Sequence, residues 1–433
     1  MLKNILIISY SYPPVNAPAA QRPYALAKYL NKSKYNITVI TCSNADSSLG
    51  FDDSFNEEIE NVSLIKIPSK IVTNPSAFRD SSMVSSKKRA KYNQKIKSLL
   101  FSLASSFVFP DKAIFWYPNV IKYLKKHKEL ISKTDIVFTT SPLFTNHLIG
   151  NFILKEKKSI RWLVDFRDFH YVENWSKKKG LKALCHKKIE NIVFKRASCI
   201  VFISAAMQKS YQNYYQNYKD KMDFIYNGFD PEDFKGLSIE PVCNDKLTIF
   251  YAGSFYRGIR SPFPLLTLLD EIIEKGYLKL DEIIIKVAGN FEQELLEEAK
   301  SFNSFSSIEF LGRIPRTQVL KQLTKADLLW LIIGDKKTHY KSVPLKLFEY
   351  LAALRPIINF APSQSEATKI IEQYNLGVSF DNNQAINNDD LRYFNDLIAD
   401  YKKGMLSKPL DEKIIDKFTR NKQALQFEKL IDG

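Results

Sequence analysis

The chain has few cysteines and few histidines, and this scarcity limits the kinds of site that it can build. Its 433 residues include only four cysteines and five histidines. The cysteines show no paired spacing suited to zinc or to a redox motif, at Cys42, Cys185, Cys199 and Cys243. No two histidines stand at a metal-ligand spacing. We therefore expect reduced thiols in a cytoplasmic protein and no metal site.

The chain also lacks a long hydrophobic run. No uninterrupted apolar stretch reaches the roughly 20 residues that a membrane-spanning helix needs. The opening residues MLKNILIISY have neither the length nor the small-residue cleavage site of a signal peptide, and they run into a proline pair. We expect a protein that does not cross a membrane.

Glycine is missing where a dinucleotide-binding protein needs it. The strand ILIISY, the amphipathic helix AQRPYALAKYL and the strand NITVITCS open the chain, and this order predicts a parallel sheet. A G-x-G-x-x-G motif would follow the first strand, but the loop there, SYPPVNAPAA, contains no glycine. An NAD-dependent enzyme is therefore disfavoured.

Acidic residues are outnumbered by basic ones. The formal net charge is +16, in a composition that is 45% apolar and 25% charged, as in a soluble globular protein. The length fits two domains of ordinary size. A strongly basic chain suggests nucleic acid, anionic lipid headgroups or phosphorylated small molecules as partners, and charge alone does not choose among them.

Lysines and aromatic residues are interleaved between Ser81 and Asp135. The aromatic residues in this stretch are Phe101, Phe107, Phe109, Phe115, Trp116, Tyr117 and Tyr123. Such a composition suits a helix lying in a lipid headgroup layer, and it also suits RNA binding through stacking. A packed helix pair with solvated lysines is the third interpretation. Nucleic acid is the least favoured, because the chain carries no RNA-binding module signature.

The segment KSVPLKLFEYLAALRPIINFAP, Lys341 to Pro362, reads as a loop, a helix that Pro344 can open, and an apolar strand. Lys346 and Glu349 share a helix face away from the leucine stripe. A phosphate can bind at a helix N-terminus beside a lysine, and a carboxylate one turn deeper can accept hydrogen bonds from sugar hydroxyls. A solvated ion pair on an exposed face is the alternative.

A second phosphate signal follows the strand LTIFYA. Gly253 and Ser254 are small residues that allow a backbone to approach phosphate closely, and Arg257 and Arg260 can neutralise its charge. Because this turn recurs with Lys346 in the same half of the chain, we favour a nucleotide diphosphate as the ligand.

Polar residues also end the strand SIRWLVDF, where Asp165, Arg167, Asp168 and His170 follow one another closely. Residues at the carboxyl end of a parallel strand face the crevice where ligands bind in open α/β sheets. The two aspartates and the arginine between them can instead neutralise one another and fix the loop.

The Lys341–Pro362 segment resembles the C-terminal-domain signature of the family 4 and related glycosyltransferases, which have the GT-B fold. The DFRD run, preceded by Ser141, Pro142 and His147, resembles a second motif of this group. The resemblance covers essentially the whole chain. It implies an α/β protein with two Rossmann-like domains facing a central cleft: an acceptor-binding domain (1–236), a nucleotide-sugar-binding domain (237–410) and a C-terminal helix (411–433) that crosses back to the first domain.

The resemblance also implies roles for individual residues. Glu349 is expected to bind the ribose, within a donor site made of Gly253, Ser254, Arg257, Arg260, Arg313, Lys346, Leu347 and Glu349. The residues expected at the reacting centre are Asp168, Arg167, Arg257 and Lys346. Those expected near the acceptor are Asn16, Ala17, Arg22, His147 and His170, although Arg22 also fits a charge on a helix face. Relatives usually carry a further glutamate two helical turns before the ribose ligand, where this chain has Lys341.

The expected function is transfer of a sugar from a nucleotide diphosphate sugar to a glycan or lipid-linked acceptor, with retention of configuration and without a metal or other cofactor. The resemblance places it in bacterial capsule, O-antigen or exopolysaccharide synthesis, in the cytoplasm, with peripheral attachment to the inner face of the cell membrane left open. The alternatives are a GT-B nucleotide-sugar 2-epimerase and a non-catalytic GT-B subunit that docks on a partner or membrane, which Lys341 favours.

Overall fold

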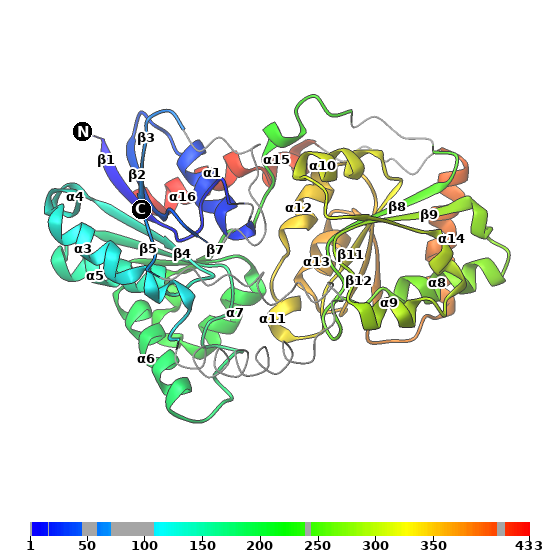
Figure 1. The fold of residues 1–433 in the computed structure, drawn as a ribbon, viewed down its shortest axis with the longest axis horizontal. Helices are drawn as coiled ribbons and strands as arrows, with labels where there is room; N and C mark the ends of the chain where they lie inside the picture. Colours follow the sequence, from blue (N-terminus) through cyan, green and yellow to red (C-terminus); the bar gives the residue numbers. More distant parts are fainter. Residues whose placement is uncertain (1, 16, 46–58, 71–107, 239–243, 405–411) are drawn as a thin grey trace, which may run out of the picture. The chain divides into compact units, whose positions relative to one another are not determined.

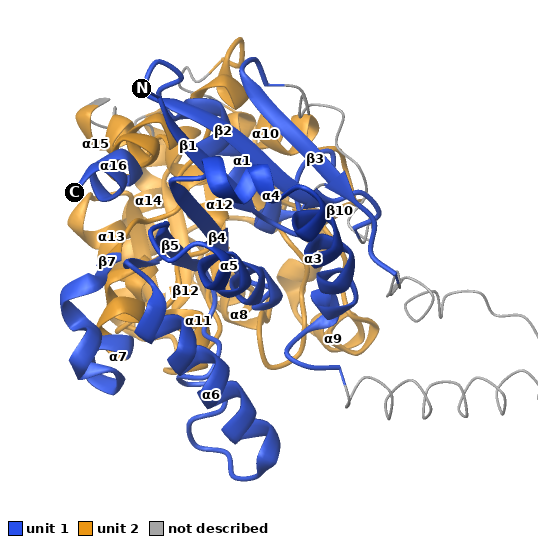
Figure 2. Ribbon diagram, turned by 90° about the vertical axis from the view of Figure 1, so that its left-hand side faces the viewer, with its two compact units in different colours: residues 1–202, 211–223, 427–433 blue, residues 203–210, 224–426 orange. Residues whose placement is uncertain are grey.

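The computed structural model describes residues 2–15, 17–45, 59–70, 108–238, 244–404 and 412–433 (Figure 1). The chain forms two compact units (Figure 2): unit 1 comprises residues 1–202, 211–223 and 427–433, and unit 2 comprises residues 203–210 and 224–426. These boundaries differ from the expected ones at 236 and 411. One reason is that Phe229 donates its backbone N–H to the carbonyl of Phe418, so the segment after residue 223 groups with unit 2.

The first sheet has seven strands in the order β3-β2-β1-β4-β5-β6-β7. The strands are β1 Lys3–Ile8, β2 Tyr35–Cys42, β3 Val62–Ile67, β4 Ile136–Thr140, β5 Arg161–Phe166, β6 Cys199–Phe202 and β7 Met222–Phe224. Neighbouring strands from β3 to β6 pair in parallel. The α-helices of this part of the chain are α1 Pro18–Tyr29, α3 Tyr117–Lys126, α4 Lys128–Lys133, α5 Thr145–Glu156, α6 Leu181–Arg196 and α7 Ala205–Tyr214.

The second sheet has six parallel strands in the order β10-β9-β8-β11-β12-β13. They are β8 Leu247–Ala252, β9 Ile283–Ala288, β10 Ile308–Gly312, β11 Leu328–Ile332, β12 Ile357–Ala361 and β13 Gly377–Asp381. The α-helices are α8 Phe263–Glu274, α9 Gln293–Ala299, α10 Arg316–Lys325, α11 Lys337–Tyr340, α12 Leu345–Ala352, α13 Glu366–Gln373, α14 Asn388–Lys402, α15 Glu412–Lys417 and α16 Arg420–Asp432.

The central strands are apolar because helices cover both faces of each sheet. All five residues are buried in each of β4 (IVFTT), β11 (LLWLI) and β12 (IINFA). Such continuous burial is typical of parallel sheets. The strand order reverses between β1 and β4 in the first sheet and between β8 and β11 in the second. Ligands bind at these reversals in open α/β sheets, outside the carboxyl ends of the strands.

The last helix, α16, begins in unit 2, and its final residues belong to unit 1. Phe427 packs edge-on against Phe138 of β4, with ring centroids 5.5 Å apart. The carboxylate of Glu428 accepts the backbone N–H of Asn31 at 2.8 Å. The C-terminal helix therefore completes the first unit, as expected.

The lysine-rich stretch between Ser81 and Asp135 is described only from residue 108, so Phe101 and Phe107 lie outside the described residues. In the described part, Trp116, Val120 and Leu124 are fully buried, and the Trp116 indole donates to the carbonyl of Ile67 at 2.9 Å. The exposed side chains of α3 include Lys122, Lys125 and Lys126. This arrangement favours the packed-helix interpretation for α3. In the described part of the chain, no helix has the length and apolar character needed to span a bilayer.

Unit 1 buries one carboxyl group completely. Glu190 on α6 is 0% exposed, and it accepts hydrogen bonds from the backbone N–H of Tyr171 at 2.7 Å and the hydroxyl of Tyr215 at 3.0 Å. The hydroxyl of Tyr211 donates to it at 3.4 Å. Burial raises the pKa of Glu190 to about 8 despite these donors.

This carboxyl group should make unit 1 less stable as the pH rises. Between about pH 4.5 and about pH 8, unfolding releases a proton that the folded protein retains, so the free energy of unfolding falls by about 1.4 kcal/mol per pH unit. Glu190→Gln removes the titration, and thermal unfolding of both proteins across this range measures the difference. We expect the melting temperature of the parent to fall relative to that of the variant; parallel curves would contradict the assignment.

Candidate functional site: a cationic pocket at the second strand reversal

Helix α12 is tied to both strands that flank the reversal of the second sheet. Pro344 caps its N-terminus, and Leu347, Phe348 and Leu351 pack into the core of unit 2. The hydroxyl of Tyr350 accepts the backbone N–H of Ala252 in β8 at 3.2 Å and donates to the carbonyl of Trp330 in β11 at 3.1 Å. The first turn of α12 is thereby held beside the carboxyl ends of β8 and β11.

Lys346 in this first turn carries a buried ammonium group that has no hydrogen-bond partner among the described residues. Its Nζ lies over the ring of Tyr251, 4.5 Å from the centroid. A Cβ atom at Gly253 would lie 2.6 Å from this nitrogen, so only glycine leaves the present space open. Burial, with a smaller contribution from the charge of Arg260, holds the pKa of Lys346 well below its ordinary value. The alternative of a solvated lysine–glutamate pair is therefore wrong.

Arg260 lies near Lys346, and His339 lies near Arg260. The Arg260 guanidinium forms no hydrogen bond or ion pair with a described residue. Its charge lowers the pKa of Lys346 behind burial, and the pKa of His339 behind burial and the charge of Lys336. His339 in α11 has a buried Nδ1 without a partner in the described structure. A Cβ at Gly334, just after β11, would lie 2.4 Å from that nitrogen. This cluster of basic groups supplies positive charge for an anion.

Glu349, one turn further along α12, is held by a buried arginine. Arg316, the first residue of α10, binds Oε1 of Glu349 through Nη1 and a carboxylate oxygen of Asp233 through Nη2. The side chains of Arg316 and Glu349 are only 8% and 10% exposed. Oε2 of Glu349 accepts no hydrogen bond from the described residues. The carboxylate is thus fixed in place with one oxygen left for a ligand hydroxyl.

Arg257 is not brought to Lys346. Its side chain is 55% exposed and pairs with Glu298 at 2.8 Å and Glu294 at 3.6 Å, both on α9. The prediction that it neutralises the phosphate therefore has no support in this arrangement. The Ser254 hydroxyl accepts the backbone N–H of Asn290 at 3.0 Å, which orders the turn after β8.

The remaining residues of this region, Leu347, Arg313 and Lys341, do not form one cluster with Lys346. The side chain of Leu347 is fully buried in the core and cannot contact a ligand there. Arg313 is exposed after β10. Lys341, at the position where relatives usually have a glutamate, donates from Nζ to the hydroxyl of Ser210 at 2.8 Å, and its carbonyl accepts the hydroxyl of Ser204. A cation therefore occupies this position and is anchored locally.

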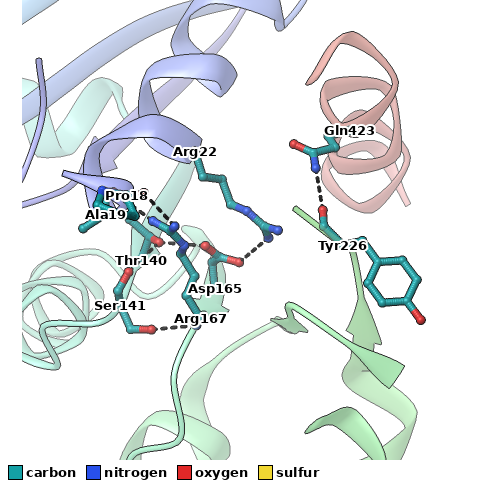
Figure 3. A network of polar contacts seen from close by, with 9 residues as sticks. All are labelled: Pro18, Ala19, Arg22, Thr140, Ser141, Asp165, Arg167, Tyr226 and Gln423. Atoms are coloured by element: carbon teal, nitrogen blue, oxygen red, sulfur yellow. Dashed lines mark hydrogen bonds and ion pairs between the residues drawn. The ribbon is translucent and has the colours of Figure 1, made fainter. Parts of the chain in front are cut away.

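In unit 1, the alternative that Asp165, Arg167 and Asp168 neutralise one another does not hold for Asp165. Asp165 pairs instead with Arg22 of α1 at 2.8 Å, and both side chains are buried (Figure 3). The hydroxyl of Thr140 donates to the second carboxylate oxygen of Asp165 at 2.7 Å. The expectation that Arg22 contacts an acceptor or lies on an exposed helix face is therefore wrong, because its guanidinium joins α1 to β5.

The Arg167 guanidinium binds the start of α1. Its guanidinium donates to the carbonyls of Ala19 at 2.9 Å and Pro18 at 2.7 Å (Figure 3). Its backbone N–H donates to the hydroxyl of Ser141 at 2.7 Å. Asp168, the next residue, is exposed and stays a candidate.

The two histidines expected near the acceptor are both held by neighbouring side chains of unit 1. His147 is completely buried, and its Nδ1 lies 2.8 Å from the hydroxyl of Thr139. Burial lowers its pKa to about 3, so it is a neutral core residue and not an acceptor ligand. His170 stacks on Phe144 with centroids 3.8 Å apart, and its Nε2 lies 3.1 Å from Nδ1 of His186. Ala17 caps α1, and Asn16 lies outside the described residues.

The sequence patterns missed Arg316, His339 and Tyr350. Arg316 lies 33 residues before its partner Glu349, and no local periodicity relates the two. The position of Arg316 directly after Pro315, at a helix start, was the only available signal. Among the described residues, no three His, Cys, Asp or Glu side chains gather in a way that could hold a metal ion.

Comparison with known proteins identifies the fold. No protein-family model matches the chain, and no curated protein sequence matches it. Solved structures do resemble it. The chain is similar to sucrose-phosphate synthase from Thermosynechococcus elongatus, with a TM-score of 0.65 and 13% identity over 99% of this chain and 98% of the other. It is also similar to a glycosyltransferase from Rickettsia africae, with a TM-score of 0.57 and 14% identity over 99% and 97%.

A third similar structure is an alpha,alpha-trehalose-phosphate synthase (UDP-forming) from Burkholderia xenovorans in complex with glucose-6-phosphate. Its TM-score is 0.59 at 10% identity, over 99% of this chain and all of the other. These matches span essentially the whole chain, and the two parallel sheets have the strand orders described above. The chain therefore has the GT-B fold, as its motifs indicated.

Proposed function

We propose that the protein is a glycosyltransferase of the hexosyltransferase type that moves a sugar from a nucleotide diphosphate sugar to a glycan or lipid-linked acceptor. The observation that carries the proposal is the buried, unpartnered ammonium of Lys346 beside the unpaired guanidinium of Arg260. Two cations held together without an acceptor are unfavourable unless an anion joins them. A diphosphate supplies two negatively charged groups of suitable size, and its place at the strand reversal is where ligands bind in such sheets.

The rest of a donor fits the same pocket. Glu349 lies one turn along α12 from Lys346 and presents its free Oε2 to a hydroxyl, as a ribose would require. The similar synthase from Burkholderia xenovorans is UDP-forming, which supports a nucleoside diphosphate as the leaving group. The similarity at 10% identity supports the fold, and the pocket residues of this chain supply the argument for the ligand.

The reaction follows from this placement. The bond between the anomeric carbon and the diphosphate oxygen breaks, and its electron pair leaves with the diphosphate. Lys346 and Arg260 stabilise the developing charge, which they can do better than water because their charges are held in place before the reaction. The acceptor hydroxyl bonds to the anomeric carbon, and its proton passes to an oxygen of the departing diphosphate. We propose retention of configuration, no metal and no other cofactor, with Asp168 beside the transferred sugar and a role in bacterial envelope polysaccharide synthesis.

Nucleotide binding should be accompanied by proton uptake. Because burial lowers the pKa of Lys346 in the free protein, a bound diphosphate will raise this pKa and increase the protonated fraction of the amine. Calorimetric titration with UDP, GDP and ADP in two buffers of different ionisation enthalpy measures this. We expect binding to be more endothermic in the buffer with the larger ionisation enthalpy. Absence of binding by all three nucleotides at millimolar concentration would refute the proposal.

Lys341 favours a second candidate, a non-catalytic subunit that binds the nucleotide. In relatives a glutamate usually occupies this position, and here a lysine bonds Ser210 instead. Incubation with a panel of UDP- and GDP-sugars separates the two. Release of free nucleotide with an acceptor supports transfer, whereas binding without release supports the subunit, and inversion of the sugar at carbon 2 indicates an epimerase.

A further inference from the structure

The most exposed large apolar side chains of the described protein lie at the start of α6 in unit 1. Leu181 is 78% exposed and Leu184 is 63% exposed. Figure 2 shows α6 and the loop before it at the periphery of unit 1. We call this region the α6 surface, and it consists of Lys177, Lys178, Lys179, Leu181, Lys182, Leu184, Lys187 and Lys188, all exposed.

The α6 surface is rich in positive charge. Residues 174–189 include six lysines and no aspartate or glutamate. The nearest carboxyl group on the helix is Glu190, which is completely buried. Leu181, Leu184 and Lys188 follow the i, i+3, i+7 spacing and so share one face, with Lys182 and Lys187 on either side. Leu181 and Leu184 are therefore flanked by exposed lysines on the helix surface.

Aromatic contacts hold this region in one conformation. The ring of Trp175 stacks on His186 of α6, with centroids 4.5 Å apart and an interplanar angle of 20°. The ammonium groups of Lys178 and Lys182 lie over the same indole, at 4.3 Å and 5.6 Å from its centroid. These contacts fix the loop against the helix before binding. Less conformational entropy is therefore lost when the lysines and leucines bind a partner.

We propose that the α6 surface docks the protein on an anionic lipid bilayer. Exposed leucines can enter the acyl boundary while the surrounding lysines bind lipid phosphates, a combination that anchors interfacial helices. The lysines complement the charge of anionic headgroups, and the exposed Leu181 and Leu184 favour a partner with an apolar interior, which a bilayer has. This inference concerns a different surface from the donor pocket and does not depend on the proposed reaction.

Our proposal assigns the lipid contact to α6 and not to the lysine-rich helix α3. The large side chains Trp116, Val120 and Leu124 of the α3 region are buried, so α3 offers lysines without exposed leucines. This difference provides a matched control within the same unit. The α6 triple variant is Lys182→Gln/Lys187→Gln/Lys188→Gln, and the α3 triple variant is Lys122→Gln/Lys125→Gln/Lys126→Gln. Both remove three exposed positive charges from one helix.

Flotation of the full chain with phosphatidylcholine vesicles, with and without phosphatidylglycerol, tests the proposal. We expect binding only to the anionic vesicles. Each removed lysine should weaken partitioning by about fivefold, so the α6 triple variant should bind on the order of a hundredfold less tightly. The α3 triple variant should bind nearly as the parent does. Leu181→Ser/Leu184→Ser should also reduce flotation, because it removes the inserted side chains.

Several outcomes would overturn the docking proposal. Equal losses in the two triple variants would indicate attraction by net charge alone. Unchanged flotation of the leucine variant would exclude insertion, and failure of the parent to float would leave the α6 surface to an acidic protein partner. Calorimetric nucleotide binding and thermal unfolding of each variant, both expected to match the parent, separate these outcomes from misfolding or from a failed donor site.

Discussion

Replacing Lys346 with methionine should weaken binding of a nucleotide diphosphate and at the same time raise the stability of the unliganded protein. The ammonium is buried without a partner, and a hydrogen bond to a charged group contributes about 1.5–3 kcal/mol, so the dissociation constant should rise about 10- to 150-fold. Turnover should fall by a further factor of about 10²–10³, as when one donor to a developing anion is removed. Methionine fills similar space, so relief of the buried polar group should stabilise unit 2 by about 1–3 kcal/mol.

These opposite changes separate a ligand-binding lysine from a structural one. Calorimetry measures the first change and denaturant unfolding the second. Lys321→Met replaces an exposed lysine of α10 in the same unit and should leave both quantities near the parent values. If Lys346→Met destabilised the protein and left nucleotide binding unchanged, Lys346 would be a packing residue and the anion pocket would be lost as an explanation.

Replacing Arg316 with methionine should produce the largest loss of stability. Arg316 neutralises Glu349 and Asp233 in a buried cluster, and removal of one partner from such a cluster typically costs about 3–5 kcal/mol because the remaining charges stay buried. Nucleotide binding should weaken as well, because Glu349 loses the contact that fixes its free oxygen. Denaturant unfolding and calorimetry measure the two effects.

The companion variants for Arg316 identify the origin of the loss. Arg316→Met/Glu349→Gln/Asp233→Asn removes all three charges and should recover much of the stability without recovering nucleotide binding. Arg392→Met breaks an exposed pair with Asp389 on α14 and should change stability by less than about 1 kcal/mol. If Arg316→Met and Arg392→Met lost similar amounts of unfolding free energy, the buried cluster around Arg316 would contribute no more to stability than an exposed ion pair.

The sequence predicted the fold because hydrophobic strands and amphipathic helices alternate throughout, and that alternation permits few arrangements. It also singled out Lys346, Glu349 and the Gly253 turn as candidates, since each belongs to a short segment at a strand or helix end. It failed for charges whose partners are distant in sequence. Arg22 and Asp165 pair across 143 residues, and a run such as DFRD does not reveal that its first aspartate is already neutralised by α1.

Arg257 illustrates a second limit. Because Arg257 stands three residues before Arg260, we expected both side chains to bind the phosphate. In the structure the two side chains have different neighbours. The backbone N–H of Arg257 donates to Glu292 at 2.7 Å, and acidic residues of α9 take its guanidinium. The sequence shows which residues of a loop are charged, but it does not show where their side chains point. Of the two arginines, only Arg260 lies near Lys346.

The path of α16 has a consequence for how the protein is made. Most of unit 1 is translated before unit 2, yet Phe427 and Glu428, which contact Phe138 and Asn31, are translated after unit 2. Until then the nascent unit 1 lacks the cover that α16 gives to Phe138. Unit 1 is thus begun before unit 2 and completed after it, and removal of residues 427–433 would expose core residues that lie hundreds of positions earlier in the sequence.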